Sequence, residues 1–266
     1  MASSPGPTYP YLMRLLGKVG LVTGAALGMG REVALAFARE GSAVVLADIN
    51  EEAGKQTTKD IENAGGKALF VRTDVSRSSE VESVVKQTLE HFGKLDILFA
   101  NAAVQLHGQD AKAHELDEEI WERTIAINLK GVWLSCKYAI AAMLADGGGQ
   151  KSVILACSPT GLTGAPGYTA YSASKGGIAA LTRTIAADYG RQGIRVNAVV
   201  PGPMETPLTA ELFADPKVRG SLEAATILGR IGRADEITGL AVFLASDEAT
   251  YCTGGLYMAD GGITAL

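Results

Sequence analysis

The fold is decided by residues 19–30, which read VGLVTGAALGMG. An apolar run ends at Thr23, glycines follow at positions 24, 28 and 30, and apolar residues then recur at helical spacing. Glycines at a strand-to-helix turn let the chain bend tightly and let a pyrophosphate approach the amides at the helix N-terminus. The spacing G-x-x-x-G-x-G differs from the commoner G-x-G-x-x-G. This turn alone therefore leaves nucleotide binding and a simple tight connection equally open.

From this unit outward, apolar β-prone runs alternate with segments of helical period. We predict strands at 19–23, 43–47, 67–72, 95–99, 152–157, 195–200 and 256–258. Helical patterns cover 29–40, 51–64, 78–91, 115–145, 169–190 and 234–246. Apolar strands that alternate with helices are typical of a parallel sheet covered on both faces. The pattern predicts the α/β class, with a single-domain, doubly wound (Rossmann-type) sheet.

The domain organisation follows from where this alternation begins and where it is interrupted. We expect residues 1–16, which contain three prolines, to be a loose lead-in, and residues 17–266 to form a single dinucleotide-binding and catalytic domain. The stretch 201–232 departs from the pattern, with four prolines between a strand and the last helix. A long insertion at the carboxyl edge of a parallel sheet is more often a substrate lid than a spare loop.

Composition excludes several classes of protein. The 266 residues include 24 Lys plus Arg and 29 Asp plus Glu, for a net charge of −5, which argues against a nucleic-acid binder. No apolar run approaches the ~20 residues needed to span a bilayer, and the first 18 residues do not read as a secretory signal. Three scattered cysteines without a CxxC pair indicate thiols in a reducing compartment. The three histidines show no metal spacing, and we expect them on the surface. We therefore predict a cytoplasmic protein without a metal, a nucleic-acid partner or a membrane partner.

Asp48 follows the apolar run 44–47 and comes 24 residues after Gly24. An acidic group at the end of the second strand accepts hydrogen bonds from the adenosine ribose hydroxyls and repels a 2′-phosphate. The next residues, Ile49 and Asn50, supply no cation to offset that repulsion. Asp48 thus favours NAD over NADP, with a solvated strand-end carboxylate as the alternative.

Tyr171 and Lys175 open a helical stretch and are spaced four residues apart, so both lie on one helical face. An unperturbed tyrosine has a pKa near ~10, too high for an efficient base at neutral pH. A nearby ammonium group, helped by an oxidised nicotinamide ring, is expected to lower that pKa. Tyr171 would then take a proton from an alcohol or return one to a ketone. By itself, Tyr-x-x-x-Lys occurs in many ordinary helices.

Together these features resemble the classical short-chain dehydrogenase/reductase family, and the match runs from about Lys18 to Gly262. The family's glycine turn stands here as Thr23, Gly24, Gly28 and Gly30. Its serine, thirteen residues before the tyrosine, is Ser158, and its asparagine is similar to Asn128 in the run INLKG. Further matching segments are Asp74-Val75, the run NAVVPG at 197–202 with Thr206, and the ending that contains Gly254-Gly255 and Asp260-Gly261-Gly262.

The resemblance implies a seven-stranded parallel sheet, a homo-oligomer with a tetramer favoured over a dimer, and a set of roles. Ser158 would bind the substrate oxygen, Tyr171 would be the general acid/base, Lys175 would hold the nicotinamide ribose, and Asn128 would position a water in a proton relay. The cofactor-binding residues would be Gly24, Leu27, Gly28, Met29, Gly30, Asp48, Ile49, Asp74, Val75, Asn101, Ala102, Ala103, Tyr171, Lys175, Pro201, Gly202 and Thr206.

Two positions depart from the family pattern. Ala103 stands where glycine is usual, so the local backbone is expected to differ, and Pro159 follows Ser158 where a serine is common. Proline fixes φ and removes a donor beside the substrate oxygen. By position in the chain, the candidate substrate contacts are Gln105, His107, Pro159, Leu162, Met204 and Leu208, and a solvated loop is an equally good reading for each.

The sequence therefore predicts an NAD-dependent oxidoreductase that interconverts a secondary alcohol and its ketone. A polyol or sugar and a cyclic alcohol remain equally open as substrates. One alternative is an NADPH-linked 3-oxoacyl reductase of the same family, and a more distant one is a non-catalytic NAD-binding sensor.

Overall fold

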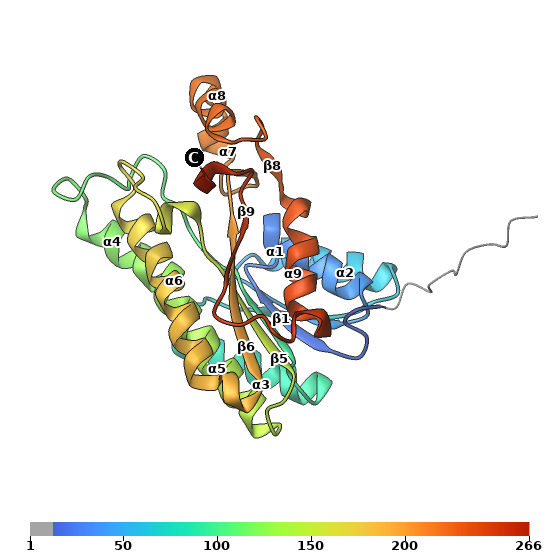
Figure 1. Ribbon diagram of the computed structural model, residues 1–266. Helices are drawn as coiled ribbons and strands as arrows, with labels where there is room; N and C mark the ends of the chain where they lie inside the picture. The colour runs from blue at the N-terminus through green and yellow to red at the C-terminus, as the bar shows by residue number, and fades with distance from the viewer. Residues whose placement is uncertain (1–12, 266) are drawn as a thin grey trace, which may run out of the picture.

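The computed structural model describes residues 13–265 and shows one twisted sheet between two layers of helices (Figure 1). The seven strands are all parallel, in the order β3-β2-β1-β4-β5-β6-β9. They are β1 (Val19–Thr23), β2 (Ala43–Asp48), β3 (Lys67–Arg72), β4 (Ile97–Ala100), β5 (Lys151–Ala156), β6 (Ile194–Pro201) and β9 (Leu256–Ala259). The predicted seven-stranded, doubly wound parallel sheet is confirmed.

Helices cover the two faces of the sheet in groups that follow from strand order. One face carries α1 (Gly28–Arg39), α2 (Glu51–Asn63) and α9 (Thr238–Ala245). The other carries α3 (Ser78–Phe92), α4 (Glu118–Ile125), α5 (Gly131–Ala145) and α6 (Thr169–Tyr189). Strand order reverses between β1 and β4. In doubly wound sheets, ligands bind beyond the carboxyl ends of the strands at such a switch point.

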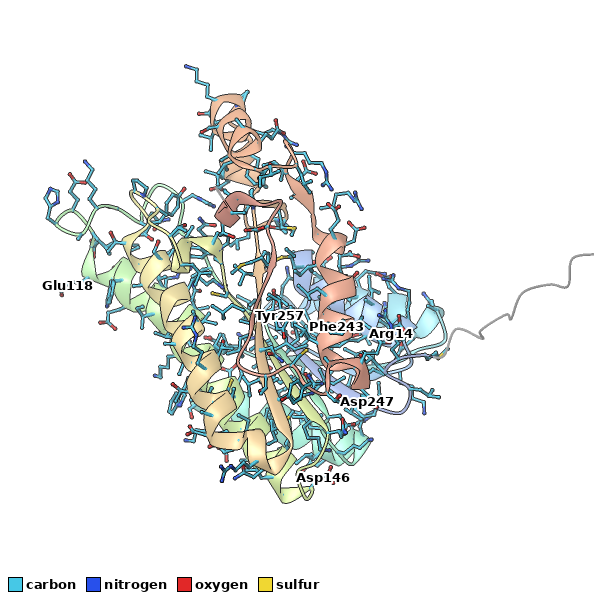
Figure 2. The ribbon with its side chains drawn as sticks, viewed as in Figure 1. Arg14, Glu118, Asp146, Phe243, Asp247 and Tyr257 are labelled. Carbon is cyan, nitrogen blue, oxygen red and sulfur yellow. The ribbon has the colours of Figure 1, made fainter. Side chains whose placement is uncertain are left out.

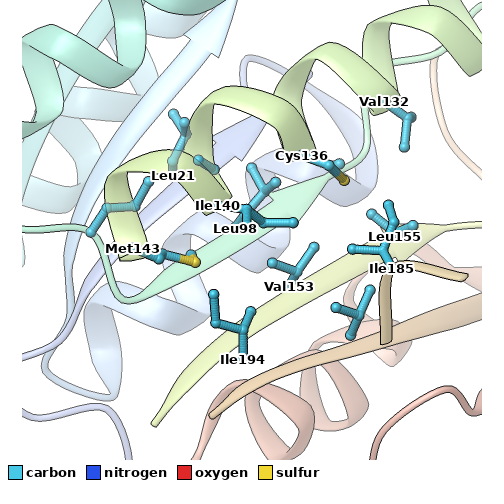
Figure 3. Packing of buried hydrophobic residues seen from close by; sticks show 14 of the residues in the cluster. Leu21, Leu98, Val132, Cys136, Ile140, Met143, Val153, Leu155, Ile185 and Ile194 are labelled. Carbon is cyan, nitrogen blue, oxygen red and sulfur yellow. The ribbon is translucent and has the colours of Figure 1, made fainter. Parts of the chain in front are cut away.

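The core lies between each helix layer and the sheet. Every residue of β4 is buried, which explains why this strand reads as a continuous apolar run rather than an alternating one. Val153 and Leu155 of β5 pack against α5 residues such as Ile140 and Met143 (Figure 3). Burial of each such side chain contributes about 1.5–3 kcal/mol. This packing holds the carboxyl ends of the strands in fixed register.

The helical pattern expected over 115–145 is confirmed from Glu118 onward, with one local departure from regular α-helix. α4 begins at Glu118 after Asp117, whose side chain accepts a hydrogen bond from the Glu119 amide. A π-helical turn then spans Ala126–Lys130 before α5 begins. Such wide turns appear mostly as local bulges at functional sites, and this one contains the fully buried Asn128. The pattern at 234–246 likewise divides into a 3₁₀ turn, Ala234–Ile237, and α9.

Other boundaries move by one or two residues, because hydrogen bonding rather than hydropathy ends an element. The fourth strand begins at Ile97 instead of 95, and the fifth begins at Lys151 and ends at Ala156. Helix α1 begins at Gly28, and β2, β6 and β9 each extend by one or more residues.

The packed domain begins earlier than the expected residue 17. Leu15 is fully buried, and the Arg14 guanidinium forms two hydrogen bonds with Glu40, at 2.6 and 3.1 Å. Arg14 lies on the α9 side of the sheet (Figure 2). The loose lead-in is thus corrected for residues 13–16, while residues 1–12 lie outside the described part of the chain.

The insertion 201–232 projects beyond the carboxyl edge of the sheet (Figure 1). It contains β7 (Met204–Glu205), α7 (Ala210–Phe213) and α8 (Pro216–Ala225), and β7 pairs with β8 (Gly232–Arg233). It is therefore a helical cap rather than an extended loop. No helix within residues 13–265 is long and apolar enough to cross a membrane.

Candidate active site

A cavity of about 750 Å³ lies between the carboxyl edge of the sheet and the insertion 201–232, within the size range of small-molecule sites. It reaches from the glycine turn after β1 to the start of α6. Most of the residues expected at a cofactor or catalytic site line it: Gly24, Leu27, Gly28, Met29, Asp48, Asn101, Ala102, Ala103, Ser158, Tyr171, Lys175, Pro201, Gly202 and Thr206. The fold brings these residues together from the carboxyl ends of five strands and from the loops and helices that follow them.

The glycine turn is shaped by close backbone contacts. Gly24 has φ +66°, and a Cβ there would lie 2.8 Å from the Cα of Ala102, so both conformation and space require glycine. The Asn101 side-chain amide donates to the carbonyls of Thr23 and Gly24, at 3.2 and 3.1 Å. Gly30 does not line the cavity, but a Cβ there would collide with the Gly24 carbonyl. Its role is close packing of helix against turn.

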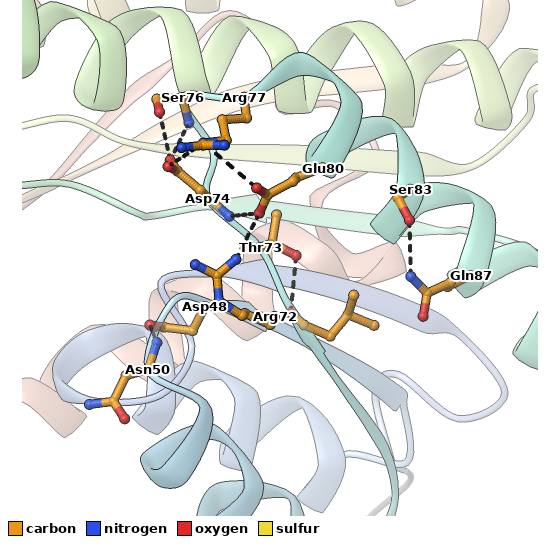
Figure 4. Close-up of polar contacts among 11 residues, drawn as sticks. Asp48, Asn50, Arg72, Thr73, Asp74, Ser76, Arg77, Glu80, Ser83 and Gln87 are labelled. Atoms are coloured by element: carbon orange, nitrogen blue, oxygen red, sulfur yellow. Dashed lines mark hydrogen bonds and ion pairs between the residues drawn. The ribbon is translucent and has the colours of Figure 1, made fainter.

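Asp48 lies at the end of β2 and is fixed to that turn. Its Oδ2 accepts from the Ala26 amide at 2.9 Å, and its Oδ1 accepts from the Asn50 amide at 2.9 Å. Arg72 pairs with Asp48 in the β2–β3 register, and its guanidinium donates to Glu80 at 3.2 Å (Figure 4). Sequence reasoning considered only cations that follow Asp48 along the chain, and it therefore missed Arg72, which comes from the neighbouring strand.

Besides Gly30, three expected cofactor residues lie outside the cavity. Asp74 accepts from Ser76 and Arg77 and so stabilises its own turn (Figure 4). Val75 is buried in a small apolar cluster and would contact a Cβ at Gly131. Ile49 is 64% exposed. The extension of the cofactor site to these residues is therefore not supported by the cavity.

Ser158, Tyr171 and Lys175 line the cavity together, and each is more than 90% buried. Ser158 follows β5 and accepts a hydrogen bond from the Thr160 hydroxyl at 3.1 Å. Lys175 donates from Nζ to the carbonyl of Ala156 at 2.8 Å, and the same Nζ lies 5.6 Å from the centre of the Tyr171 ring. The expected placement of both side chains on one helical face is confirmed.

The protein's own groups raise the pKa of Tyr171, and the lowering expected beside an oxidised nicotinamide ring stays a prediction. Burial raises the pKa of Tyr171 to about 12, and the Ser158 side chain only partly opposes that effect. Burial lowers the pKa of Lys175 to about 8. The physical reason is that both side chains are removed from water, which disfavours the charged form of each.

Asn128 lies just behind the cavity in the π-helical turn. Its side chain accepts from the Val104 amide and donates to the Val104 carbonyl, both at 2.8 Å, and it also donates to Ser174 at 3.3 Å. The Ser174 hydroxyl in turn donates to the Tyr171 carbonyl at 2.7 Å. Asn128 thus joins the loop after β4 to α6. Its role in a proton relay stays a prediction.

Four of the six candidate substrate residues line the cavity: Gln105, Pro159, Met204 and Leu208. Leu162 and His107 do not line it. His107 is half-buried rather than a surface residue, because its Nε2 lies 3.2 Å from the Leu208 carbonyl and its ring meets Tyr168 edge-on. Ala103 causes no left-handed strain, since no non-glycine residue within 13–265 has a positive φ.

Sequence reasoning missed several cavity residues in and near the insertion. They are Tyr168, Leu212, Phe213, Lys217, Val218 and Leu222. The helical spacing of Val218 and Leu222 was a readable signal for an apolar face. The direction of that face depends on how the insertion folds back over the sheet, which the sequence pattern does not give.

The cysteines and histidines form no metal site in the described chain. Cys136 and Cys157 are buried free thiols, and Cys252 is half-buried and free. Cys157 lines the cavity next to Ser158. No group of three or more His, Cys, Asp or Glu residues between positions 13 and 265 is arranged to hold a metal ion.

Comparisons with known proteins agree over nearly the whole chain. Residues 24–264 match the family model described as enoyl-(acyl carrier protein) reductase. The chain is 41% identical over 249 residues to cis-4-hydroxycyclohexanecarboxylate dehydrogenase of Sinomonas cyclohexanicum, a match that covers 94% of this chain and 97% of that relative.

Solved structures give the same result. A short-chain type dehydrogenase/reductase from Mycobacterium marinum is similar with a TM-score of 0.89 and 33% identity, covering 96% of this chain and 98% of its own. A putative NAD(P)-dependent gluconate 5-dehydrogenase from Beutenbergia cavernae, with bound NADP at low occupancy, is similar with a TM-score of 0.89 and 31% identity. That match covers 96% of this chain and 100% of the solved one.

Proposed function

The chain belongs to the classical short-chain dehydrogenase/reductase family, and on that premise we propose that it is an NAD-dependent oxidoreductase that interconverts a secondary alcohol and its ketone. One observation carries the proposal. A single cavity has the Asp48 carboxylate beside the glycine turn at one end and the group Ser158, Tyr171 and Lys175 at the other. This arrangement suits an extended dinucleotide whose reactive ring meets a small substrate.

The residues present fit a nicotinamide dinucleotide. The amides at the start of α1 suit a pyrophosphate, and Asp48 suits two ribose hydroxyls. Lys175 and Thr206 would hold the nicotinamide side. When bound, the nicotinamide ring supplies hydride acceptance or donation and, in its oxidised form, a positive charge.

The protein's own part is proton transfer and orientation. Ser158 donates a hydrogen bond to the substrate oxygen, and Tyr171 takes the hydroxyl proton as the alcohol is oxidised or returns it to the ketone. The Nζ of Lys175 lies 5.6 Å from the centre of the Tyr171 ring, so its protonated form favours the phenolate. Because burial raises the pKa of Tyr171 to about 12, alcohol oxidation should accelerate and ketone reduction should slow as pH rises.

NAD rather than NADP is supported by the Asp48 charge at the ribose end of the cavity. Arg72, which is paired with Asp48 on the next strand, is a cation that would meet a 2′-phosphate, but its guanidinium donates a hydrogen bond to Glu80. An NADPH-linked 3-oxoacyl reductase is the alternative. The Beutenbergia structure, which has bound NADP, is the reason to include this alternative in the test below. A non-catalytic sensor is disfavoured because Asn128, Ser158, Tyr171 and Lys175 are all present.

The cap end of the cavity favours a compact apolar body in the substrate over a polyol. Its side chains are mainly apolar: Met204, Pro207, Leu208, Leu212, Phe213, Val218 and Leu222. Lys217 also lines it, and between residues 13 and 265 Lys217 forms no ion pair. We therefore propose a cyclic secondary alcohol that carries a carboxylate, a chemistry that the Sinomonas relative's name also describes.

The test is reduced-nicotinamide absorbance with purified protein, NAD⁺ or NADP⁺, and matched alcohols: 4-hydroxycyclohexanecarboxylate, its methyl ester, cyclohexanol and gluconate. We expect turnover of the cyclic alcohols with NAD⁺, with the carboxylate preferred to the ester by about tenfold, because a hydrogen bond to a charged group contributes about 1.5 kcal/mol or more. Lys217→Gln should remove that preference, whereas Lys112→Gln on an exposed loop should not. Turnover only with NADP(H) and a 3-oxoacyl thioester would establish the alternative, and measurable NAD⁺ binding without turnover would favour the sensor.

We also propose a cytoplasmic homo-oligomer, with a tetramer favoured. Large apolar side chains on α4 and α5 support an interface there, since Trp121 is 37% exposed and Trp133 is 44% exposed. Light scattering at working concentration tests this proposal, and a monomer mass would contradict it.

A further inference from the structure

The N-terminus of α6, the helix that carries Tyr171, has no local cap. Tyr168 occupies the N-cap position, its side chain makes no capping hydrogen bond, and the first turn contains no acidic residue. The first amides of any helix lack partners within the helix and must bind other acceptors. The start of α6 therefore depends on groups from elsewhere in the chain.

Asp110, about sixty residues upstream, supplies those acceptors. Its Oδ1 accepts from the Ala170 amide at 3.1 Å, and its Oδ2 accepts from the Tyr171 amide at 2.9 Å. These are the second and third amides of the helix, the two that an N-cap side chain normally binds. The negative charge also suits the positive end of the helix. Asp110 thus does the work of an N-cap from a distant loop.

The contact is held from both sides. The Thr169 hydroxyl donates to the Ala111 carbonyl at 2.7 Å, and the Ala111 amide donates to Asp110 Oδ1 at 3.0 Å. The Asp110 amide donates to the Leu106 carbonyl at 2.9 Å, which fixes the loop around it. The carboxylate therefore sits on a loop that cannot easily move away from the helix.

The same loop is tied to two other parts of the site. Its beginning, Val104, binds the Asn128 side chain through both its amide and its carbonyl. His107, three residues before Asp110, contacts the insertion 201–232 at the Leu208 carbonyl. The loop 104–111 thus connects the cap, the π-helical turn and the first turn of α6.

We infer that Asp110 is a positioning residue for Tyr171, an inference that rests on the proposed function because it assigns Tyr171 the acid/base role. Asp110 does not line the cavity, so it acts through the Tyr171 backbone. It sets where α6 begins and hence where the phenol lies relative to Ser158. Acid/base catalysis is sensitive to such placement, and a displacement of about 1 Å can cost about a hundredfold in rate.

The first experiment needs no substrate. Amide hydrogen exchange is compared between the wild-type protein and the Asp110→Ala and Asp110→Asn variants, on a peptide that contains residues 169–172. We expect exchange of this peptide to rise about tenfold or more in Asp110→Ala, with the C-terminal half of α6 unchanged. The control is Asp117→Ala, which removes an N-cap from α4 and should leave the α6 peptide unchanged. Unchanged exchange in Asp110→Ala would overturn the inference.

The second experiment separates positioning from general stability. We expect kcat for alcohol oxidation to fall about 10- to 100-fold in Asp110→Ala, with the KM for NAD⁺ unchanged. Asp110→Asn keeps the shape and one acceptor oxygen, so it should fold like wild type and recover part of the loss. A kcat within twofold of wild type in both variants, or an equal loss in Asp117→Ala, would overturn the inference. Absence of turnover in the wild-type protein would instead contradict the proposed function, while the exchange result would still test the contact.

Discussion

Two buried lysines at opposite ends of β5 have opposite surroundings. Lys151, the first residue of the strand, is 6% exposed and pairs with Asp96 at 2.8 Å and Asp146 at 2.6 Å. Lys175 reaches the last residue of the same strand, where it binds only the Ala156 carbonyl and, in the described chain, pairs with no carboxylate. At the amino edge of the sheet, two carboxylates neutralise the buried charge of Lys151. At the carboxyl edge, the charge of Lys175 has no carboxylate partner in the described chain.

The pKa directions follow this difference. Hydrogen bonds with Asp146 and Asp96 outweigh the effect of burial and raise the pKa of Lys151, whereas burial alone lowers the pKa of Lys175 to about 8. An unpaired buried charge destabilises a fold unless it has another use. Groups with strongly perturbed pKa values gather at functional sites. The amino edge of the sheet, with Lys151, thus contributes to stability, whereas the carboxyl edge, with Lys175, carries the groups suited to catalysis.

The largest expected effect is on activity at the carboxyl edge. Tyr171→Phe removes one hydroxyl and should lower kcat about 10³-fold, because general acid/base groups contribute about 10²- to 10⁴-fold. The melting temperature should not fall, because the lost hydroxyl forms no strong buried ion pair or hydrogen bond within residues 13–265. Tyr189→Phe, at the far end of the same helix, should leave kcat unchanged in the same assay. Intact turnover in Tyr171→Phe would show that another group transfers the proton.

Replacing each of the two lysines with methionine should change the free energy of unfolding in opposite directions. Lys151→Met leaves Asp96 buried without its main partner and should destabilise the protein by about 3 kcal/mol. Lys175→Met should instead stabilise it at pH 7 by up to about 3 kcal/mol, since a pKa lowered from 10.5 to about 8 corresponds to that cost of burying the charge. Denaturant unfolding without cofactor measures both free energies.

The pH dependence of that comparison has a definite sign. Between pH 8 and 10.5 the unfolded chain protonates Lys175 and the folded chain does not, so the stability of the wild-type protein rises with pH in this window. The advantage of Lys175→Met over wild type should therefore shrink from pH 8 to pH 10. An advantage that is constant with pH would contradict the lowered pKa.

Two aspartates at the same two edges sharpen the comparison further. Asp48→Asn keeps an acceptor for the Ala26 amide but removes the charge, so the ratio of kcat/KM for NAD⁺ to that for NADP⁺ should fall about 10- to 100-fold. Asp96→Asn at the amino edge should lower stability and leave the ratio unchanged, because Asp96 is bound to Lys151 and to the Val19 amide. Initial rates with NAD⁺ and with NADP⁺ give this ratio for each of the two variants.

The smallest expected effect lies in the insertion 201–232. Phe213→Ala enlarges the cap end of the cavity and should raise the KM for the alcohol about three- to tenfold, while NAD⁺ binding stays the same. Leu144→Ala is the control, because Leu144 is a partly exposed apolar side chain on α5 away from the cavity. An equal change in the KM for NAD⁺ would mean that the cap serves the cofactor as well.

The sheet, its helix layers and the central part of the site could be predicted from the amino-acid sequence. Strand and helix periods are local properties, the glycine turn is required by backbone conformation at Gly24, and Tyr171 and Lys175 share a face because helical geometry fixes it. Each of these features depends on residues that are close together in the chain.

The contacts between segments far apart in the chain could not be predicted, because they depend on the complete fold. Asp110 reaches the Tyr171 amide across 61 residues, Arg72 lies beside Asp48 through strand pairing, and Asn128 turns inward because a π-helical turn replaces regular helix. The raised pKa of Tyr171 has the same origin, because burial is set by the whole fold. Pairing, burial and loop placement are sums over contacts made by the entire chain, and no local pattern of residues contains them.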